Sequence, residues 1–174
     1  MESSKVEHRV KRVSLRVMGL VAVLLAAGCS GPRSSTGGSA VRPVERLDLL
    51  LTPMALDLDG RPGVDGFGVR IYASNRRSSF GSAIQEGTLE VLMFDGSVRT
   101  EDLAKTPPLR IWRYPASELK PYSQKTSIGT GYRFALGWGE QKPQGERITV
   151  LARYEAPDKI AVTSAPGAIS VMLK

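Results

Sequence analysis

Two residue types that carry much of enzyme chemistry are nearly absent from this sequence. Among 174 residues there is one histidine, His8, and one cysteine, Cys29. A single cysteine excludes an intramolecular disulfide. Beyond Cys29 the chain offers neither an imidazole nor a thiol, which excludes zinc sites built on His and Cys and nucleophiles activated by a histidine base.

Long hydrophobic runs and a strong excess of positive charge are also lacking. The one extended apolar run covers residues 17–27, well short of the roughly 20 residues that a membrane-spanning helix requires. The formal net charge is +7, but residues 1–28 contribute +3, so only +4 remains in residues 29–174. This modest charge, with acidic residues interspersed, argues against a nucleic-acid partner.

The N-terminus has the features of an exported precursor. A basic segment from Lys5 to Arg16 precedes the apolar run, which ends in the sequence Leu25-Ala-Ala-Gly-Cys29. Charge, apolar run, small residues and the single cysteine together resemble the lipobox signal peptide of bacterial lipoproteins. The resemblance covers residues 1–29, with Ala26 where Leu is more usual. It implies cleavage before Cys29 and acylation of that cysteine; an uncleaved membrane anchor is the alternative.

The resemblance also predicts domain boundaries and an address. Residues 1–28 would be the signal peptide, and residues 29–44 the lipidated cysteine with a flexible tether, because this segment is rich in Ser and Gly. Residues 45–174 would form the folded domain. By family analogy the protein lies in the cell envelope, lipid-anchored and facing the periplasm. Ser30, rather than an acidic residue, follows the cysteine, which favours the outer over the inner membrane.

From Glu45 onward the pattern is typical of β-structure. Apolar and polar residues alternate within short segments that Gly and Pro separate, which predicts strands at 46–52, 67–73, 88–94, 109–114, 131–138, 147–154, 160–163 and 169–173. The best helix signal is a single turn at 116–119 with Ser117 as its cap. We therefore predict an all-β domain, an antiparallel two-sheet sandwich of seven or eight strands after an N-terminal signal helix and linker. Immunoglobulin-like or transthyretin-like topology is the first choice, and a small barrel the second.

A glycine-rich loop carries the most concentrated set of possible ligands. Within residues 57–66 stand three aspartates, Asp57, Asp59 and Asp65. Their oxygens suit Ca²⁺, the one cofactor that this sequence suggests. Pro62 and Gly68 break the EF-hand pattern at its sixth and twelfth positions. The loop loosely resembles Asp-Gly-rich loops of prealbumin-like and adhesin sandwich modules, but a polar turn linking two strands has the same composition.

Two further places are candidates for contact with a ligand or partner. Trp112 stands opposite Ile111 in strand alternation, which predicts an exposed side chain. Arg76 and Arg77 lie in the loop 75–81, which is typical of a solvated hairpin tip and also of a segment that contacts anionic lipid headgroups.

These features together predict a membrane-anchored envelope lipoprotein with a non-enzymatic binding or structural domain. The expected partners are the membrane, through the N-terminal lipid, and an envelope protein or glycan. Two alternatives stay open: a calcium-stabilised, adhesin-like module, and a hydrolase of envelope glycan that works with two carboxylates. No spacing selects a pair among the acidic residues Glu86, Glu90, Asp95, Glu101, Asp102 and Glu118.

Overall fold

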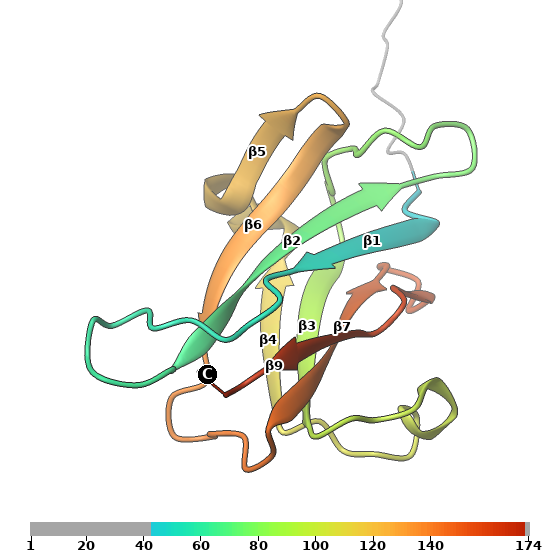
Figure 1. Cartoon of the computed structure of the whole chain (residues 1–174). Helices are drawn as coiled ribbons and strands as arrows, with labels where there is room; N and C mark the ends of the chain where they lie inside the picture. Colours follow the sequence, from blue (N-terminus) through green and yellow to red (C-terminus); the bar gives the residue numbers. More distant parts are fainter. Residues whose placement is uncertain (1–42, 173–174) are drawn as a thin grey trace, which may run out of the picture. The chain divides into compact units, whose positions relative to one another are not determined.

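The computed structural model describes residues 43–172, and these residues form two antiparallel β-sheets that pack face to face (Figure 1). The predicted signal peptide, Cys29 and all but the last two residues of the predicted tether lie outside the described residues. Within this range no helix is long and apolar enough to span a membrane.

Nine strands make up the two sheets. The first sheet has the order β1-β2-β6-β5, and the second has the order β4-β3-β7-β8, with β9 also paired to β7. The strands are β1 (Arg46–Leu51), β2 (Gly66–Ser74), β3 (Thr88–Asp95), β4 (Arg110–Pro115), β5 (Ser123–Thr126), β6 (Gly129–Gly137), β7 (Arg147–Glu155), β8 (Ala161–Thr163) and β9 (Gly167–Ser170). Three short 3-10 turns accompany them: η1 (Thr100–Asp102), η2 (Ala116–Glu118) and η3 (Lys120–Tyr122).

This strand order corresponds to the A-B-E-D and C′-C-F-G sheets of immunoglobulin-like domains. The predicted all-β sandwich is therefore confirmed. Of the two topologies predicted first, the strand order agrees with the immunoglobulin-like one. The last strand position is divided between β8 and β9, which pair with successive halves of β7. Ser164 lies at this division, where its hydroxyl accepts a hydrogen bond from the Ala152 amide at 3.1 Å and so maintains the pairing along β7.

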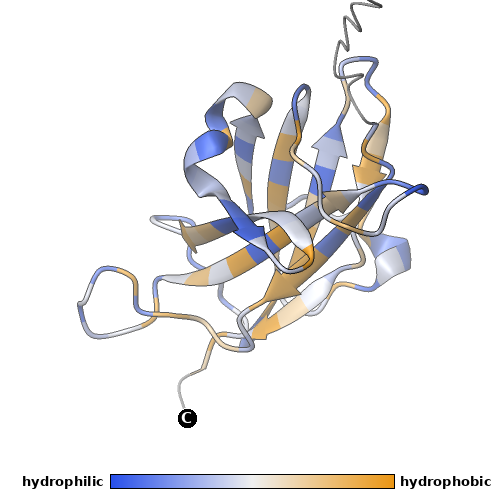
Figure 2. Cartoon of the chain, turned by 90° about the horizontal axis from the view of Figure 1, so that it is seen from above, coloured by the Kyte–Doolittle hydropathy of each residue, from blue (hydrophilic) through white to orange (hydrophobic). Residues whose placement is uncertain are grey.

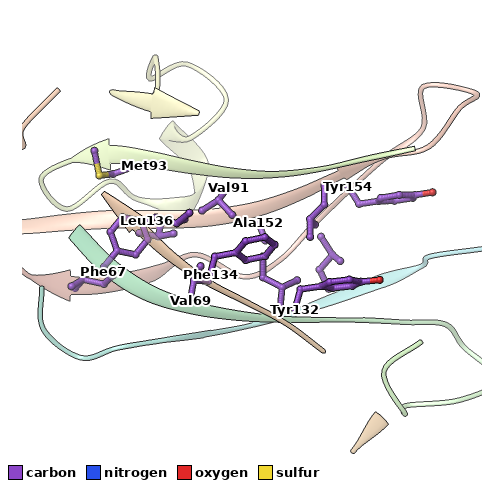
Figure 3. Close-up of a cluster of buried hydrophobic side chains, with 14 of the residues drawn as sticks. Phe67, Val69, Val91, Met93, Tyr132, Phe134, Leu136, Ala152 and Tyr154 are labelled. Atoms are coloured by element: carbon purple, nitrogen blue, oxygen red, sulfur yellow. The ribbon is translucent and has the colours of Figure 1, made fainter. Parts of the chain in front are cut away.

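The core lies between the sheets and follows from the alternation of side chains. Figure 2 shows hydrophobic and hydrophilic residues alternating along the strands, and Figure 3 shows the apolar side chains of both sheets meeting in one cluster. The inward residues of β6 and its extension are buried: Tyr132, Phe134, Leu136 and Trp138. The core extends from Val44 to Val171 within the described residues, so the sandwich has the self-contained core expected of an independently folding domain.

Strand β3 is buried on both faces. Its inward residues join the main core, while Leu92 and Phe94 on the other face form a second cluster with Ile111 and residues around η1. This second cluster explains the nearly continuous apolar sequence of the strand, which the alternation rule alone does not require.

Three details differ from the predicted elements. Strand β5 was not predicted, because its sequence Ser-Gln-Lys-Thr has no apolar residue and its stability comes from pairing with β6. The last strand ends earlier than predicted, at Ser170. The turn at 116–119 exists as η2, but its N-cap is Pro115 and no side chain caps it, so the predicted capping role of Ser117 is wrong.

Candidate functional site

The three aspartates of the β1–β2 connection converge in space. One carboxylate oxygen from each of Asp57, Asp59 and Asp65 lies within 4.8 Å of the others. Asp57 and Asp59 are exposed, and Asp65 is half-buried. These residues are eight positions apart at most, so the loop must fold back on itself to bring them together.

Backbone hydrogen bonds hold this loop in its folded-back shape. Asp57 accepts from the Gly60 amide at 2.8 Å, Asp59 from the Arg61 amide at 2.9 Å, and Asp65 from the Leu58 amide at 2.6 Å. Gly60 has φ +74°, a conformation that favours glycine.

The triad can bind a cation or serve as a self-contained turn. Carboxylate and carbonyl oxygens are the ligands that Ca²⁺ prefers, and water would complete its six to eight positions. Arg61 lies 3.8 Å from the Asp59 carboxylate and neutralises part of the charge. Because each aspartate also accepts a local amide hydrogen bond, the same geometry satisfies a polar turn without a metal.

Arg76 and Arg77 lie at the tip of a tight hairpin turn. The Asn75 side chain accepts hydrogen bonds from the amides of Arg77 and Ser78 at 2.9 and 3.1 Å, which closes the turn and leaves both arginines exposed. Glu45 accepts a hydrogen bond from the Arg76 amide at 2.7 Å, and its carboxylate lies 3.9 Å from the Arg76 guanidinium. The predicted solvated hairpin tip is therefore present.

Trp112 does not lie on the outer face, and the predicted exposed side chain is wrong. It is half-buried against the main core, with its ring 5.6 Å from Phe67 in an edge-to-face arrangement. The Arg110 guanidinium lies 5.0 Å from the Trp112 ring centre. Ile111 faces the second cluster instead. Each face of β4 carries an arginine as well as apolar side chains, so alternation alone could not identify the core side.

An ion triad around a buried carboxylate, on the outer face of the five-stranded sheet, was not predicted. The Glu90 side chain is 5% exposed, and its two oxygens accept hydrogen bonds from Arg113 at 2.8 Å and Arg153 at 2.6 Å. The three residues occupy facing register positions on β4, β3 and β7. The signal in the sequence was Glu90, an acidic residue inside an apolar strand. Its two arginine partners can be identified only once the register of the strands is known.

A cationic and apolar groove on the outer face of the four-stranded sheet was also not predicted. Arg70 and Arg133 face each other across β2 and β6, next to Leu50 of β1. Neither arginine forms an ion pair within residues 43–172. Together with Leu56 and Leu58 they line a groove of about 450 Å³. Like charges in directly opposite positions repel, so an anionic group bound there would relieve that repulsion.

Comparison with protein-family models, with curated proteins and with solved structures finds no match to this chain. Function is therefore inferred from the N-terminal motif and from the geometry of the described residues.

Proposed function

We propose that this chain is the precursor of a lipid-anchored envelope lipoprotein whose β-sandwich acts as a non-enzymatic binding or structural domain. The observation that carries the proposal is the sequence Leu25-Ala-Ala-Gly-Cys29 behind a basic segment and a short apolar run. Two or three acyl chains on Cys29 suffice for stable anchoring, because each buried methylene contributes about 0.8 kcal/mol.

The spacing between Cys29 and the sandwich keeps the domain near the membrane. Val44 already packs against the core, so about 14 residues connect it to the anchor. A Ser/Gly-rich segment of this length spans roughly 20 Å on average. A domain on such a tether acts at the membrane surface and does not cross the envelope.

A non-enzymatic role is supported by the chemistry available after Cys29. That part of the sequence has no histidine and no other cysteine, and its exposed surfaces combine arginines with apolar side chains. Surfaces of this kind bind partners or lipids. The hairpin tip and the groove beside Arg70 and Arg133 are the two candidate contact surfaces.

The experiment that tests this function is chemical cross-linking in the native cell, followed by purification through a C-terminal tag and mass spectrometry. We expect a dominant envelope protein that is lost with Cys29→Ser, because that variant releases the domain from the membrane. Recovery of glycan alone, together with cleaved glycan products, would overturn the non-enzymatic proposal in favour of a carboxylate-based hydrolase.

A calcium-stabilised module is the second candidate function. The observation that favours it is the convergence of Asp57, Asp59 and Asp65 within 4.8 Å. Calcium would then stabilise the β1–β2 connection and not take part in a reaction.

A further inference from the structure

The chain enters the sandwich beside the hairpin tip. The Glu45 amide donates a hydrogen bond to the Ser74 carbonyl at 2.9 Å, at the end of β2. The Glu45 side chain then binds the Arg76 amide. In Figure 1 the loop after β2 and the β5–β6 turn lie at one end of the sandwich. The residues that follow the proposed lipid anchor therefore join the domain at this end.

Two large apolar side chains are exposed at the same end. Phe80 is 60% exposed and Ile128 is 52% exposed. Gly81 and Gly129 form a parallel bridge, in which the Gly81 amide donates to the Ile128 carbonyl and the Thr130 amide donates to the Gly81 carbonyl, both at 2.8 Å. This bridge brings the preceding residues, Phe80 and Ile128, side by side.

Basic residues lie close in sequence to this apolar pair. Arg76, Arg77 and Lys125 are exposed, and Lys125 lies on β5 next to the β5–β6 turn. Arg76 has a partner in Glu45, whereas Arg77 and Lys125 form no ion pair within residues 43–172. Two more carboxylates, Glu86 and Asp158, line a hollow on the other side of Arg76. We call the five residues Arg76, Arg77, Phe80, Lys125 and Ile128 the tip surface.

We propose that the tip surface docks onto an anionic phospholipid bilayer. Phe80 and Ile128 insert at the boundary between headgroups and acyl chains, where aromatic and aliphatic side chains are buried without loss of hydration for nearby polar groups. The three basic side chains contact lipid phosphates, whose negative surface potential attracts them. This inference rests on the proposed function in one respect: the lipid anchor on Cys29 would place a bilayer within reach of a tether of about 14 residues.

Docking would fix the orientation of the sandwich on the membrane. A lipid anchor alone leaves a tethered domain free to rotate. Contact through the tip surface would hold the opposite end, with the β6–β7 connection, away from the bilayer and accessible to other envelope components. The acyl chains would hold the domain at the membrane, and the basic, apolar tip surface would set its orientation there.

The test uses the lipidated protein reconstituted into vesicles, with an environment-sensitive fluorophore on a single introduced thiol. Phe80→Cys places the probe in the tip surface, and Gln141→Cys places it in the exposed β6–β7 connection as the control. With phosphatidylglycerol in the vesicles we expect a blue shift and quenching by brominated lipid at position 80 but not at position 141. Equal solvent exposure at the two positions would overturn the proposal.

Charge reversal tests the role of the basic residues. In the Phe80→Cys background, Arg77→Glu with Lys125→Glu should lower the ratio of inserted to water-exposed probe by about tenfold or more. Lys105→Glu with Lys142→Glu makes the same charge change elsewhere and should leave the ratio unchanged. Near-ultraviolet circular dichroism checks that each variant keeps its tertiary structure. An unchanged ratio in the tip variant would contradict the proposed phosphate contacts.

The same samples separate this proposal from that of the lipid anchor. The parent chain, without an added cysteine, takes up label only if Cys29 is not acylated, and labelling there would overturn the anchor. An acylated parent with a water-exposed probe at position 80 would overturn docking alone. Shielding of the probe only after addition of a protein from the envelope would assign the tip surface to a protein partner instead.

Discussion

Glu90 is a charged side chain in the middle of a strand that is buried on both faces. Each of its carboxylate oxygens accepts a hydrogen bond from one arginine, Arg113 on one neighbouring strand and Arg153 on the other. Burial of an unpaired carboxylate is costly, and pairing from both sides offsets that cost. The triad therefore links three neighbouring strands of its sheet, β4, β3 and β7.

The two arginines of this triad should contribute unequally to stability. Arg153 is 33% exposed and Arg113 is 60% exposed, so water compensates less for the loss of Arg153. We expect Arg153→Ala to lower the free energy of unfolding by about 2 kcal/mol and Arg113→Ala by about 1 kcal/mol. Urea denaturation measures both. A larger loss for Arg113→Ala would contradict the assigned pairing.

Tyr132 should make the domain sensitive to alkaline pH. Burial raises the pKa of its hydroxyl above the ordinary value of 10.0, although the hydrogen bond from the Ile84 amide acts in the opposite direction. Because the folded pKa exceeds the unfolded one, the stabilisation is complete below about pH 10 and is lost as pH rises through the folded pKa. The pKa values of Tyr114 and Tyr154 are also raised by burial.

Replacement of this tyrosine separates the effect of its hydrogen bond at neutral pH from the effect of its ionisation at alkaline pH. Tyr132→Phe leaves the buried Ile84 amide without its acceptor, so stability at neutral pH should fall by about 1–2 kcal/mol. The decline of stability above about pH 10 should become shallower than in the parent. Urea unfolding at neutral and alkaline pH measures both changes. If stability declines above about pH 10 as steeply in Tyr132→Phe as in the parent, folding does not raise the pKa of Tyr132.

At the level of strands, the parts of the fold that could be predicted are those whose apolar residues alternate with polar ones or run nearly continuously. Alternation predicted the strands in 67–73, 131–138 and 147–154, because their inward residues face the opposite sheet, although Leu151 on the outer face of β7 is also buried, in the second cluster. Where both faces mix arginine with apolar residues, as in β4, alternation could not place Trp112. Polar β5 gave no signal, because pairing with β6 forms it.

The candidate sites that could be predicted from the sequence are those whose residues lie close together in the chain. The aspartate triad was predictable because its residues lie close in sequence and glycine allows the chain to fold back. The exposed arginines of the hairpin tip follow from their turn. Glu90 with its two arginines, and the pair Arg70 and Arg133, depend on cross-strand register, which no local pattern specifies.

The β5–β6 turn depends on Gly129. Its φ is +103°, and an added Cβ would clash with the Gly81 carbonyl oxygen. Gly96 is a matched control, with φ +75° and nothing within 4 Å of an added Cβ. We expect Gly129→Ala to cost about 3 kcal/mol or more and Gly96→Ala about 1 kcal/mol. Equal losses in urea denaturation would contradict the close approach of the two segments.

Calcium should stabilise the β1–β2 connection if the triad is a metal site. Millimolar calcium should raise the melting temperature by roughly 3 °C or more, because a ligand that binds only the folded state stabilises it. Asp59→Asn should abolish the rise while it keeps the local amide hydrogen bond, and Asp102→Asn, outside the triad, should preserve it. Differential scanning calorimetry with and without chelator measures the shift. No rise in the parent protein would assign the triad to a polar turn.

At the scale of the whole molecule, we distinguish three parts: the proposed anchor, the predicted tether and the sandwich. The sandwich has its own core, and its tip surface lies where the chain enters from the N-terminal side. A short tether and a basic, apolar tip would act in the same direction, toward the membrane. The proposed location of the sandwich at the membrane depends on the chemistry proposed for Cys29.

The mass of the mature protein, purified from membranes of its native host, is the most direct test. We predict a chain that begins at Cys29, lacks residues 1–28 and carries a diacylglyceryl group on that cysteine, with or without a further acyl chain on its amine. A chain that retains Met1 and has a free thiol at Cys29 would contradict the lipoprotein assignment.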